Sequence, residues 1–424
     1  SYNFTDGDLN VCVTQIRMFL ETYETIPYSV IRFLCGEINY GGRVTEQQDR
    51  ILLITLLEGY IHPGIHEPGY KYSPSGKYVT TNAADCKQFL RVIQYYPAFA
   101  DPEIFGLHTN ADITGQQNAT SELLSTILNM QPRNSASGVE GDAREGQVTN
   151  RLVDMLAKMP NPFSMEDTLL KFPSKYEESM NTVLTQECVR FNDLLEVMSN
   201  TLQETMKALK GLVVMNPELE AIALAVYDNR VPERWANKAY PSLKSLSTWM
   251  LDLVKRHQFA QDWMNNGHPK VYWISGFFFP QAFLTGLLQN YARNHKMPID
   301  TVSFGFEVMS VREADVQEPS DHGCFITGMF LEGARWCHKG RTLTESRPKE
   351  LYTEMPLVSL IPTQHRQVPT EGVYACPLYK TLTRWGMLST TGHSTNFIIH
   401  VEVPSLLPQK HWIARGVALF TSLR

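Results

Sequence analysis

Apolar residues recur every three or four positions along the first two thirds of the chain, which is the spacing of amphipathic helices. A first helix is predicted by a stripe of apolar residues at Leu9, Val13, Ile16 and Leu20. Thr5 and Asp8 precede it as a capping box. A much longer helix is predicted from Tyr176 to Leu209, which contains neither Gly nor Pro. Further helices are predicted over residues 27–36, 45–58, 84–95, 116–130, 217–227 and 243–263.

From Ile299 onward the pattern changes to short segments in which apolar and polar residues alternate, bounded by Gly, Pro and Asp. Strands are predicted over residues 302–308, 323–331, 356–361, 372–377, 396–403 and 411–420. The most apolar window, residues 271–288, is interrupted by Ser275, Gly276 and Pro280, so it indicates a buried strand and helix and not a membrane span. The expected fold class is α+β multidomain, with helices followed by a small incomplete antiparallel β-barrel.

Composition narrows the class of protein without naming a function. The 424 residues are 43% apolar and 19% charged, which suits two or three globular domains. A net charge of −6 provides no basic surface for nucleic acid or anionic lipid, and no secretory signal opens the chain. Seven scattered cysteines without a Cys-x-x-Cys pair favour a reducing, cytoplasmic setting. Residues 134–146, which are rich in Ser, Gly and acidic side chains, are predicted to be a mobile surface loop.

Motifs for nucleotide or metal binding are incomplete. The segments 64–71 and 328–335 space two glycines as a phosphate-binding loop does, but neither has the Lys-Ser/Thr pair that contacts phosphate and Mg²⁺. His62 and His66 are four residues apart, yet Pro63 and Gly64 between them disfavour the helix that would align two ligands. We therefore predict neither a nucleotide loop nor a metal site in these segments.

The segment Gly392-His393-Ser394 looks like the nucleophile elbow of a serine hydrolase. Asn396 stands where that motif needs a second glycine, and the side chains of sequence neighbours diverge on a strand, so His393 is poorly placed to activate Ser394. A polar turn is the favoured interpretation. A stand-alone hydrolase that uses Ser394 is the alternative.

Several unusual segments occur in a characteristic order along nearly the whole chain. They are 39–45 (NYGGRVT), 104–113 (IFGLHTNADI), 211–215 (GLVVM), 231–235 (VPERW), 240–244 (YPSLK), 273–279 (WISGFFF), 289–293 (QNYAR), 330–336 (FLEGARW), 376–381 (CPLYKT) and 386–397 (GMLSTTGHSTNF). Together they resemble the C-terminal region of axonemal dynein heavy chains.

The resemblance implies three parts and a role without chemistry of its own. Residues 1–112 are expected to be the helical lid of the sixth AAA+ module, 113–298 the helical part of the C-terminal domain, and 299–424 its β-barrel part. The chain is expected to pack on the AAA+ ring of an ATP-driven, minus-end-directed microtubule motor and to modulate its conformational coupling. No cofactor is expected in these residues; ATP and Mg²⁺ are expected in earlier modules of a longer parent chain.

The resemblance also implies partners and residues to examine. The partners are other AAA+ modules of the same heavy chain and, through the parent complex, intermediate chains, light chains and microtubules of the ciliary or flagellar axoneme. Arg43 precedes a helix where a sensor arginine could face a γ-phosphate; an ion pair with Asp49 or a contact with a neighbouring subdomain is the alternative. The candidates for docking on the ring are Leu184, Phe191, Leu195, Phe277 and Phe278.

Overall fold

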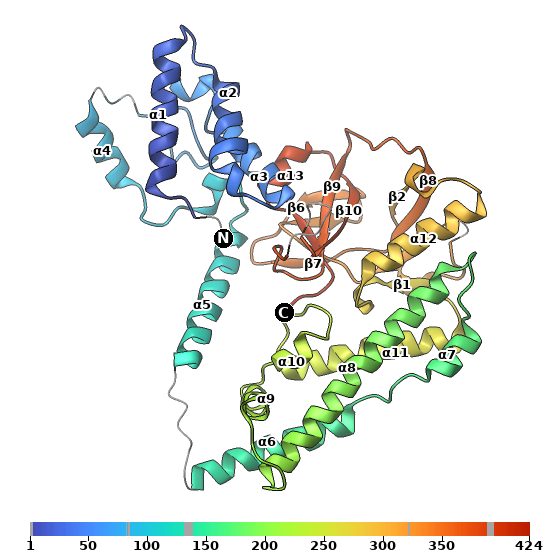
Figure 1. The fold of residues 1–424 in the computed structure, drawn as a ribbon. Coiled ribbons are helices and arrows are strands. Elements are labelled where there is room, and N and C mark those ends of the chain that lie inside the picture. Colours follow the sequence, from blue (N-terminus) through green and yellow to red (C-terminus); the bar gives the residue numbers. More distant parts are fainter. Residues whose placement is uncertain (1–2, 82, 84, 131–138, 321–322, 388–393) are drawn as a thin grey trace.

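Helices come first along the chain and strands come last, which confirms a mixed α and β architecture (Figure 1). The computed structural model describes residues 3–81, 83, 85–130, 139–320, 323–387 and 394–424. Within these ranges no helix is long and apolar enough to cross a membrane.

The N-terminal unit, residues 3–109, is a group of helices joined by long loops. Its helices are α1 (Asp6–Thr22), α2 (Tyr28–Phe33), the π-helix η1 (Leu34–Asn39), α3 (Gln47–Glu58) and α4 (Cys86–Tyr95), with short 3-10 turns at Gly41–Arg43, Pro63–His66 and Pro102–Phe105. The predicted capping box is confirmed, because the Asp8 amide donates to the Thr5 hydroxyl and the Thr5 amide donates to the Asp8 carboxylate.

Helix α5 (Asn110–Met130) leaves the N-terminal unit as a single projecting helix (Figure 1). Every side chain from Gly115 to Leu128 is exposed, although the helix carries large apolar residues at Leu123, Leu124, Ile127 and Leu128. The expected boundary between residues 112 and 113 falls inside this helix.

A block of helices follows, and it is built around the predicted long helix. That helix, α8 (Ser179–Leu209), buries Leu184, Phe191, Leu195 and Leu202 at helical spacing. Around it lie α6 (Val139–Lys158), α7 (Met165–Lys171), α9 (Pro217–Tyr227), α10 (Glu233–Ala236), α11 (Leu246–Asn266) and α12 (Pro280–Asn294). The loop predicted over 134–146 is wrong from Val139 onward, where α6 begins; residues 134–138 lie outside the described part of the chain.

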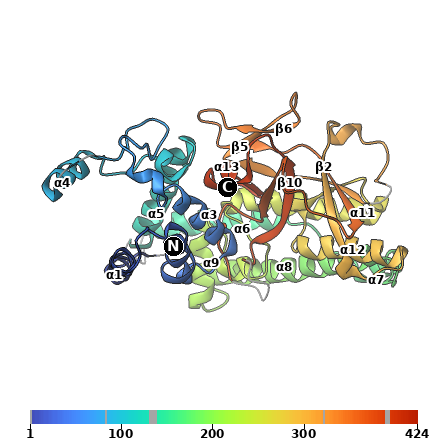
Figure 2. The same ribbon diagram turned by 90° about the horizontal axis from the view of Figure 1, so that it is seen from above.

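The strands form two larger sheets and a hairpin. One sheet has the order β1-β3-β8-β2 and the other β10-β9-β11-β4-β7, while β5 pairs with β6. Their bounds are β1 Val271–Trp273, β2 Val302–Val308, β3 Cys324–Thr327, β4 Phe330–Glu332, β5 Ala334–Cys337, β6 Thr342–Glu345, β7 Tyr352–Glu354, β8 Val358–Gln364, β9 Val373–Tyr379, β10 Phe397–Pro404 and β11 Ala418–Phe420. Helices α8 and α12 lie on one side of these strands and the β5–β6 hairpin on the other (Figure 2).

Several details of the predicted β region are wrong. The pairs β1–β3 and β9–β11 are parallel, so the strands are not all antiparallel. The strand predicted over 323–331 is two strands in different sheets, separated at Gly328. Residues 411–414 belong to the helix α13 (Gln409–Ala414), and only Ala418–Phe420 of the last predicted segment is a strand. The described strands form no closed barrel.

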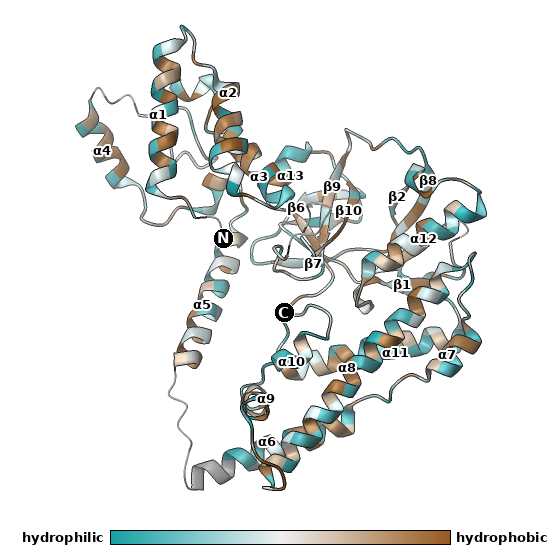
Figure 3. Ribbon diagram, in the orientation of Figure 1, coloured by the Kyte–Doolittle hydropathy of each residue, from teal (hydrophilic) through white to brown (hydrophobic). Residues whose placement is uncertain are grey.

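One large hydrophobic core joins the helical block to the sheets. It draws on residues from Val148 to Leu419, so the parts expected over 113–298 and 299–424 share it. The N-terminal unit, in contrast, buries few of its apolar side chains, among them Phe19, Ile31 and Val44. Its helix α1 exposes several large apolar residues. The brown segments of α1 in Figure 3 mark its apolar residues. The N-terminal unit is therefore attached to a body that has a core of its own.

Candidate functional site: the junction of the N-terminal unit

Helix α3 of the N-terminal unit lies against the last part of the chain through polar side chains. Gln48 Nε2 is 2.6 Å from His400 Nε2 on β10, and the amide of Ser394 donates to Glu46 Oε2 over 3.3 Å. At the other end of α3, Lys410 on α13 pairs with Glu58 at 2.6 Å. Burial raises the pKa of Glu46, while the hydrogen bond from the Ser394 amide acts in the opposite direction.

A second set of contacts fixes the segment that leads from the N-terminal unit into α5. The guanidinium of Arg415 donates to the carbonyl oxygens of Gly106 and Leu107 at 2.9 and 3.2 Å. It is itself held by Glu345, which also pairs with His411 at 2.6 Å. Arg415 therefore connects α13, β6 and the end of the N-terminal unit.

The side chain of Asn110, the first residue of α5, makes three hydrogen bonds at the junction. Its amide nitrogen donates to the carbonyl oxygens of Arg347 and Glu350 at 2.8 and 3.0 Å, and its oxygen accepts from the Lys349 amide at 2.7 Å. Further along α5, Arg424 donates to Asn118 at 2.6 Å. These contacts fix α5 to the body that carries the sheets.

Ser394 serves a turn at this junction. Its hydroxyl is buried and accepts a hydrogen bond from the Asn396 amide at 3.1 Å, whereas an elbow nucleophile has to be exposed. The side chain of Asn396 in turn pairs with both the backbone and the hydroxyl of Thr381. The neighbouring Gly392 and His393 lie outside the described residues. The geometry of Ser394 therefore fits the polar turn that the sequence favours.

Arg43 makes its ion pair inside the N-terminal unit. Its Nη1 atom lies 2.8 Å from the Asp8 carboxylate and 3.2 Å from the carbonyl oxygen of Asn3, so the ion pair is made with Asp8 and not with Asp49, which was one of the alternatives. Hydrogen bonds from the amide and hydroxyl of Thr5 lower the pKa of Asp8, and the Arg43 charge adds to this effect. Arg43 thus holds the start of α1 against the turn that precedes α3.

The five residues predicted to dock on a ring lie in the interior of the chain. Leu184, Phe191 and Leu195 are each 1% exposed, and Phe277 and Phe278 are 4% and 7% exposed. Phe191 and Phe278 meet edge to face with their ring centroids 4.6 Å apart. The amphipathic pattern is that of a core face, so these side chains cannot form an external surface in this conformation.

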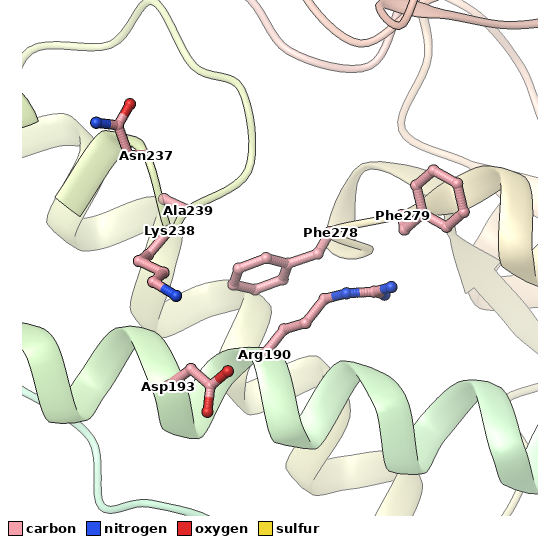
Figure 4. Close-up of a pocket in the computed structure, with 7 residues that line it drawn as sticks. All are labelled: Arg190, Asp193, Asn237, Lys238, Ala239, Phe278 and Phe279. Carbon is pink, nitrogen blue, oxygen red and sulfur yellow. The ribbon is translucent and has the colours of Figure 1, made fainter. Parts of the chain in front are cut away.

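Beside Phe278 the surface is hollowed into an open pocket of about 290 Å³ (Figure 4). It is lined by Arg190 and Asp193 of α8, residues 237–239 and the aromatic pair Phe278 and Phe279. Arg190 extends beneath Phe278 toward Phe279, and it pairs with the buried carboxylate of Glu187 at 2.9 Å. The pocket offers cations and aromatic rings. No group of three or more His, Cys, Asp and Glu side chains suited to a metal occurs in the described part of the chain.

Sequence reasoning missed the junction because no local pattern marks it. Asn110 lies in the segment 104–113 that carries the resemblance, but its partners are more than two hundred residues away. Gln48, His400 and Arg415 are single polar residues with no characteristic spacing.

Comparison with known proteins places both sides of the junction in one family. The AAA lid domain of dynein heavy chains matches residues 1–111, and the C-terminal domain of dynein heavy chains matches residues 117–421. Dynein axonemal heavy chain 1 of Rattus norvegicus and that of Homo sapiens are each 51% identical over 423 residues, covering 100% of this chain and 9% and 10% of those proteins. Dynein axonemal heavy chain 3 of Mus musculus is 43% identical over 422 residues, with 100% of this chain and 10% of that protein covered. The chain thus spans about a tenth of these relatives, and it belongs to the dynein heavy chain family.

Proposed function

We propose that this chain is the regulatory C-terminal part of an axonemal dynein heavy chain, a minus-end-directed microtubule motor of cilia and flagella. Its parts are the lid of the sixth AAA+ module at 1–112, the helical part of the C-terminal domain at 113–298 and the β part at 299–424. In this proposal ATP and Mg²⁺ bind in other modules, while intermediate chains, light chains and microtubules are reached through the parent complex. The chain itself modulates the conformational coupling of the ring and catalyses no reaction.

The junction is the observation that carries this proposal. It joins a helical unit with little buried apolar surface to a body with a continuous core, through hydrogen bonds and ion pairs such as Arg415–Gly106 and Lys410–Glu58. Polar interfaces between domains permit relative motion, since few kcal/mol hold them in one arrangement. A movement of the lid can therefore be transmitted to the C-terminal domain through the contacts of the junction. The same contacts can also oppose that movement.

Exposed apolar surface indicates where the rest of a ring would pack. Helix α1 exposes Leu9, Val13 and Leu20 to 50%, 45% and 54%, and the outward residues of α5 are comparably exposed. Several large exposed apolar side chains on one helix are typical of an interface. Because the chain spans only about a tenth of the length of its relatives, we assign the exposed faces of α1 and α5 to contacts with other AAA+ modules of the same heavy chain.

The test weakens the junction in the full heavy chain. Asn110→Ala and Arg415→Ala remove contacts between the lid and the C-terminal domain, and Arg234→Ala removes an exposed ion pair with Glu218 away from the junction as the control. We expect the two junction variants to change microtubule-stimulated ATPase, velocity and force, because a coupling of about 1–3 kcal/mol alters populations roughly 5–150-fold. The affinity for ATP of the nucleotide sites in the other modules should equal that of the wild type within experimental error.

The result that contradicts the proposal is unchanged stimulation, velocity and force in variants whose junction is shown to be loosened by faster hydrogen exchange at residues 104–114. A change of equal size in Arg234→Ala also contradicts it, because the effect would then not be specific to the junction.

A further inference from the structure

Two free cysteines border one crevice where α1 packs on the π-helix η1. Cys12 lies on α1 and Cys35 lies on η1, and both are half-buried. The thiol of Cys12 accepts a long hydrogen bond from Asn39 Nδ2 at 3.8 Å, and the same Asn39 pairs with Gln15 on α1. Asn39 therefore holds the two elements in the arrangement that presents Cys12 to η1.

Both thiols border the same narrow crevice. Cys12, Gln15, Ile16 and Phe19 line it from α1, and Leu34 and Cys35 from the opposite side. Burial, the charge of Cys12 and a hydrogen bond between the two thiols together raise the pKa of Cys35 to about 11, and burial is the largest cause. π-helical turns are rare, and those that occur are often found at functional sites.

We propose that Cys12 and Cys35 are an oxidisable dithiol that a hydroperoxide converts into a disulfide between α1 and η1. In the first step the Cys12 thiolate attacks the peroxide, forming a sulfenic acid and releasing an alcohol or water. In the second step the Cys35 thiolate attacks the Cys12 sulfur, the S–S bond forms, and hydroxide leaves and takes up the proton lost by Cys35 as water. Two thiols are oxidised and one peroxide is reduced.

The order of the two steps follows from the environment of Cys35. The thiolate is the nucleophile, and Cys35 ionises with difficulty, so it is the poorer first reactant. One of the causes that raise its pKa, the charge of the Cys12 thiolate, disappears once Cys12 has become an uncharged sulfenic acid. Burial, the largest cause, remains at the step in which Cys35 attacks.

The disulfide would act on a weakly fixed element. Helix α1 buries only Asp8 and Phe19, and its side-chain ties to the rest of the unit include Arg43–Asp8 and Gln15–Asn39. A covalent link from Cys12 to Cys35 removes conformations in which α1 detaches. In a reducing compartment such a bond forms transiently, as redox-sensing disulfides do. This inference does not depend on the proposed role in a motor.

The experiment treats the native full-length protein with hydrogen peroxide, blocks the remaining thiols with N-ethylmaleimide and maps peptides by mass spectrometry. A Cys12–Cys35 linked peptide that dithiothreitol releases is the expected product. Each of Cys12→Ser and Cys35→Ser should abolish it. Cys86→Ser, which changes an exposed cysteine on α4, should leave it unchanged. In the oxidised wild type the amides of α1 and η1 should exchange at least roughly tenfold more slowly than in the reduced protein.

Three outcomes overturn the proposal. Cys12 and Cys35 could both remain open to N-ethylmaleimide at a peroxide dose that oxidises Cys86. Either could be linked to another cysteine instead. A Cys12–Cys35 bond that leaves exchange in α1 unchanged would show that the helix is not restrained by it.

Discussion

At the residue scale, charged side chains lie where the helical block meets the sheets. The Glu187 carboxylate is buried, which raises its pKa, although the amides of Phe278 and Phe279 and the guanidinium of Arg190 act in the opposite direction. Lys380 follows β9 and places its ammonium 5.2 Å from the Phe279 ring centroid. Burial lowers the pKa of Lys380 to about 8; Glu187 opposes this shift and Arg190 adds to it.

Lys380→Met should increase the free energy of unfolding at pH 7, by about 1–3 kcal/mol, because the charged amine is costly where it is partly desolvated. The direction in which the stability difference changes with pH follows from proton binding. Between pH 8 and 10.5 the unfolded lysine holds more protons than the folded one, so wild-type stability gains on the variant as pH rises through this window. Urea unfolding at pH 7 and pH 10 measures the difference.

Lys238→Met provides the control, since Lys238 is an exposed lysine that lines the pocket beside Phe278 and Phe279. It should change stability by less than about 0.5 kcal/mol at either pH. A Lys380→Met variant that is less stable than the wild type at pH 7, or whose stability relative to the wild type falls with pH no more than that of Lys238→Met, contradicts the argument.

Residue roles could be predicted from the sequence only where the partners are close in the chain. The Thr5–Asp8 capping box spans three residues and was predicted correctly. The partner of Arg43 was not, because Asp8 is 35 positions away. The apolar face of α8 was recognised, but a sequence does not say whether such a face meets its own core or another domain, and Leu184, Phe191 and Leu195 meet the core.

At the scale of elements, Gly328 decides where one sheet ends and the next begins. It has φ +87°, and a Cβ atom there would lie 2.4 Å from the Trp273 ring. Its carbonyl oxygen accepts from the Ser275 hydroxyl at 2.6 Å. The chain therefore turns at this point under the indole, so β3 and β4 fall in different sheets.

Gly328→Ala should lower the free energy of unfolding by about 2–4 kcal/mol, the sum of a left-handed backbone and a clash with the indole. Gly372→Ala is the matched control, because Gly372 also has a positive φ, +73°, but nothing lies within 4 Å of its added methyl. Its cost should be about 1–2 kcal/mol. Equal costs measured by thermal or urea unfolding would show that the approach to Trp273 carries no strain.

Elements with a clear period were mostly predicted well, although the 20-residue helix α6 was missed, and short elements were predicted poorly. The 31-residue helix α8 and the strand β2 follow from many repeats of one period. Helix α13 has six residues, which is too few for a period of 3.6 to be separated from alternation, and it was predicted as a strand. Strands β5 to β7 have three or four residues each and were missed.

At the scale of the whole molecule, the hydrophobic core is unevenly distributed. It joins the helical block and the sheets from Val148 to Leu419, while the N-terminal unit relies on a few buried residues and on the junction. Elements with few buried apolar contacts open locally at a small fraction of the global free energy.

Native-state hydrogen exchange should therefore be at least about 100-fold faster in α1 to α4 than in α8 and α11. Arg415→Ala should accelerate exchange in residues 104–114 and in α3, because its contacts with Gly106 and Leu107 are lost, and leave α8 unchanged. Mass-spectrometric exchange on the wild type and the variant measures both effects. Uniform protection across the chain, or a variant that accelerates α8 as much as α3, would contradict the division into a firm body and a weakly held unit.

Helix α5 can convert a small rotation of the body that carries the sheets into a larger displacement at its far end. Asn110 and Asn118 bind it to the body that carries the sheets, and beyond Asn118 it continues to Met130. At 1.5 Å per residue its 21 residues make an arm of about 30 Å. A rotation of that body by about 10° would move the far end of the arm by about 5 Å, close to one helical turn. A small tilt at one end of the molecule thereby becomes a step large enough to shift side chains from one set of neighbours to the next.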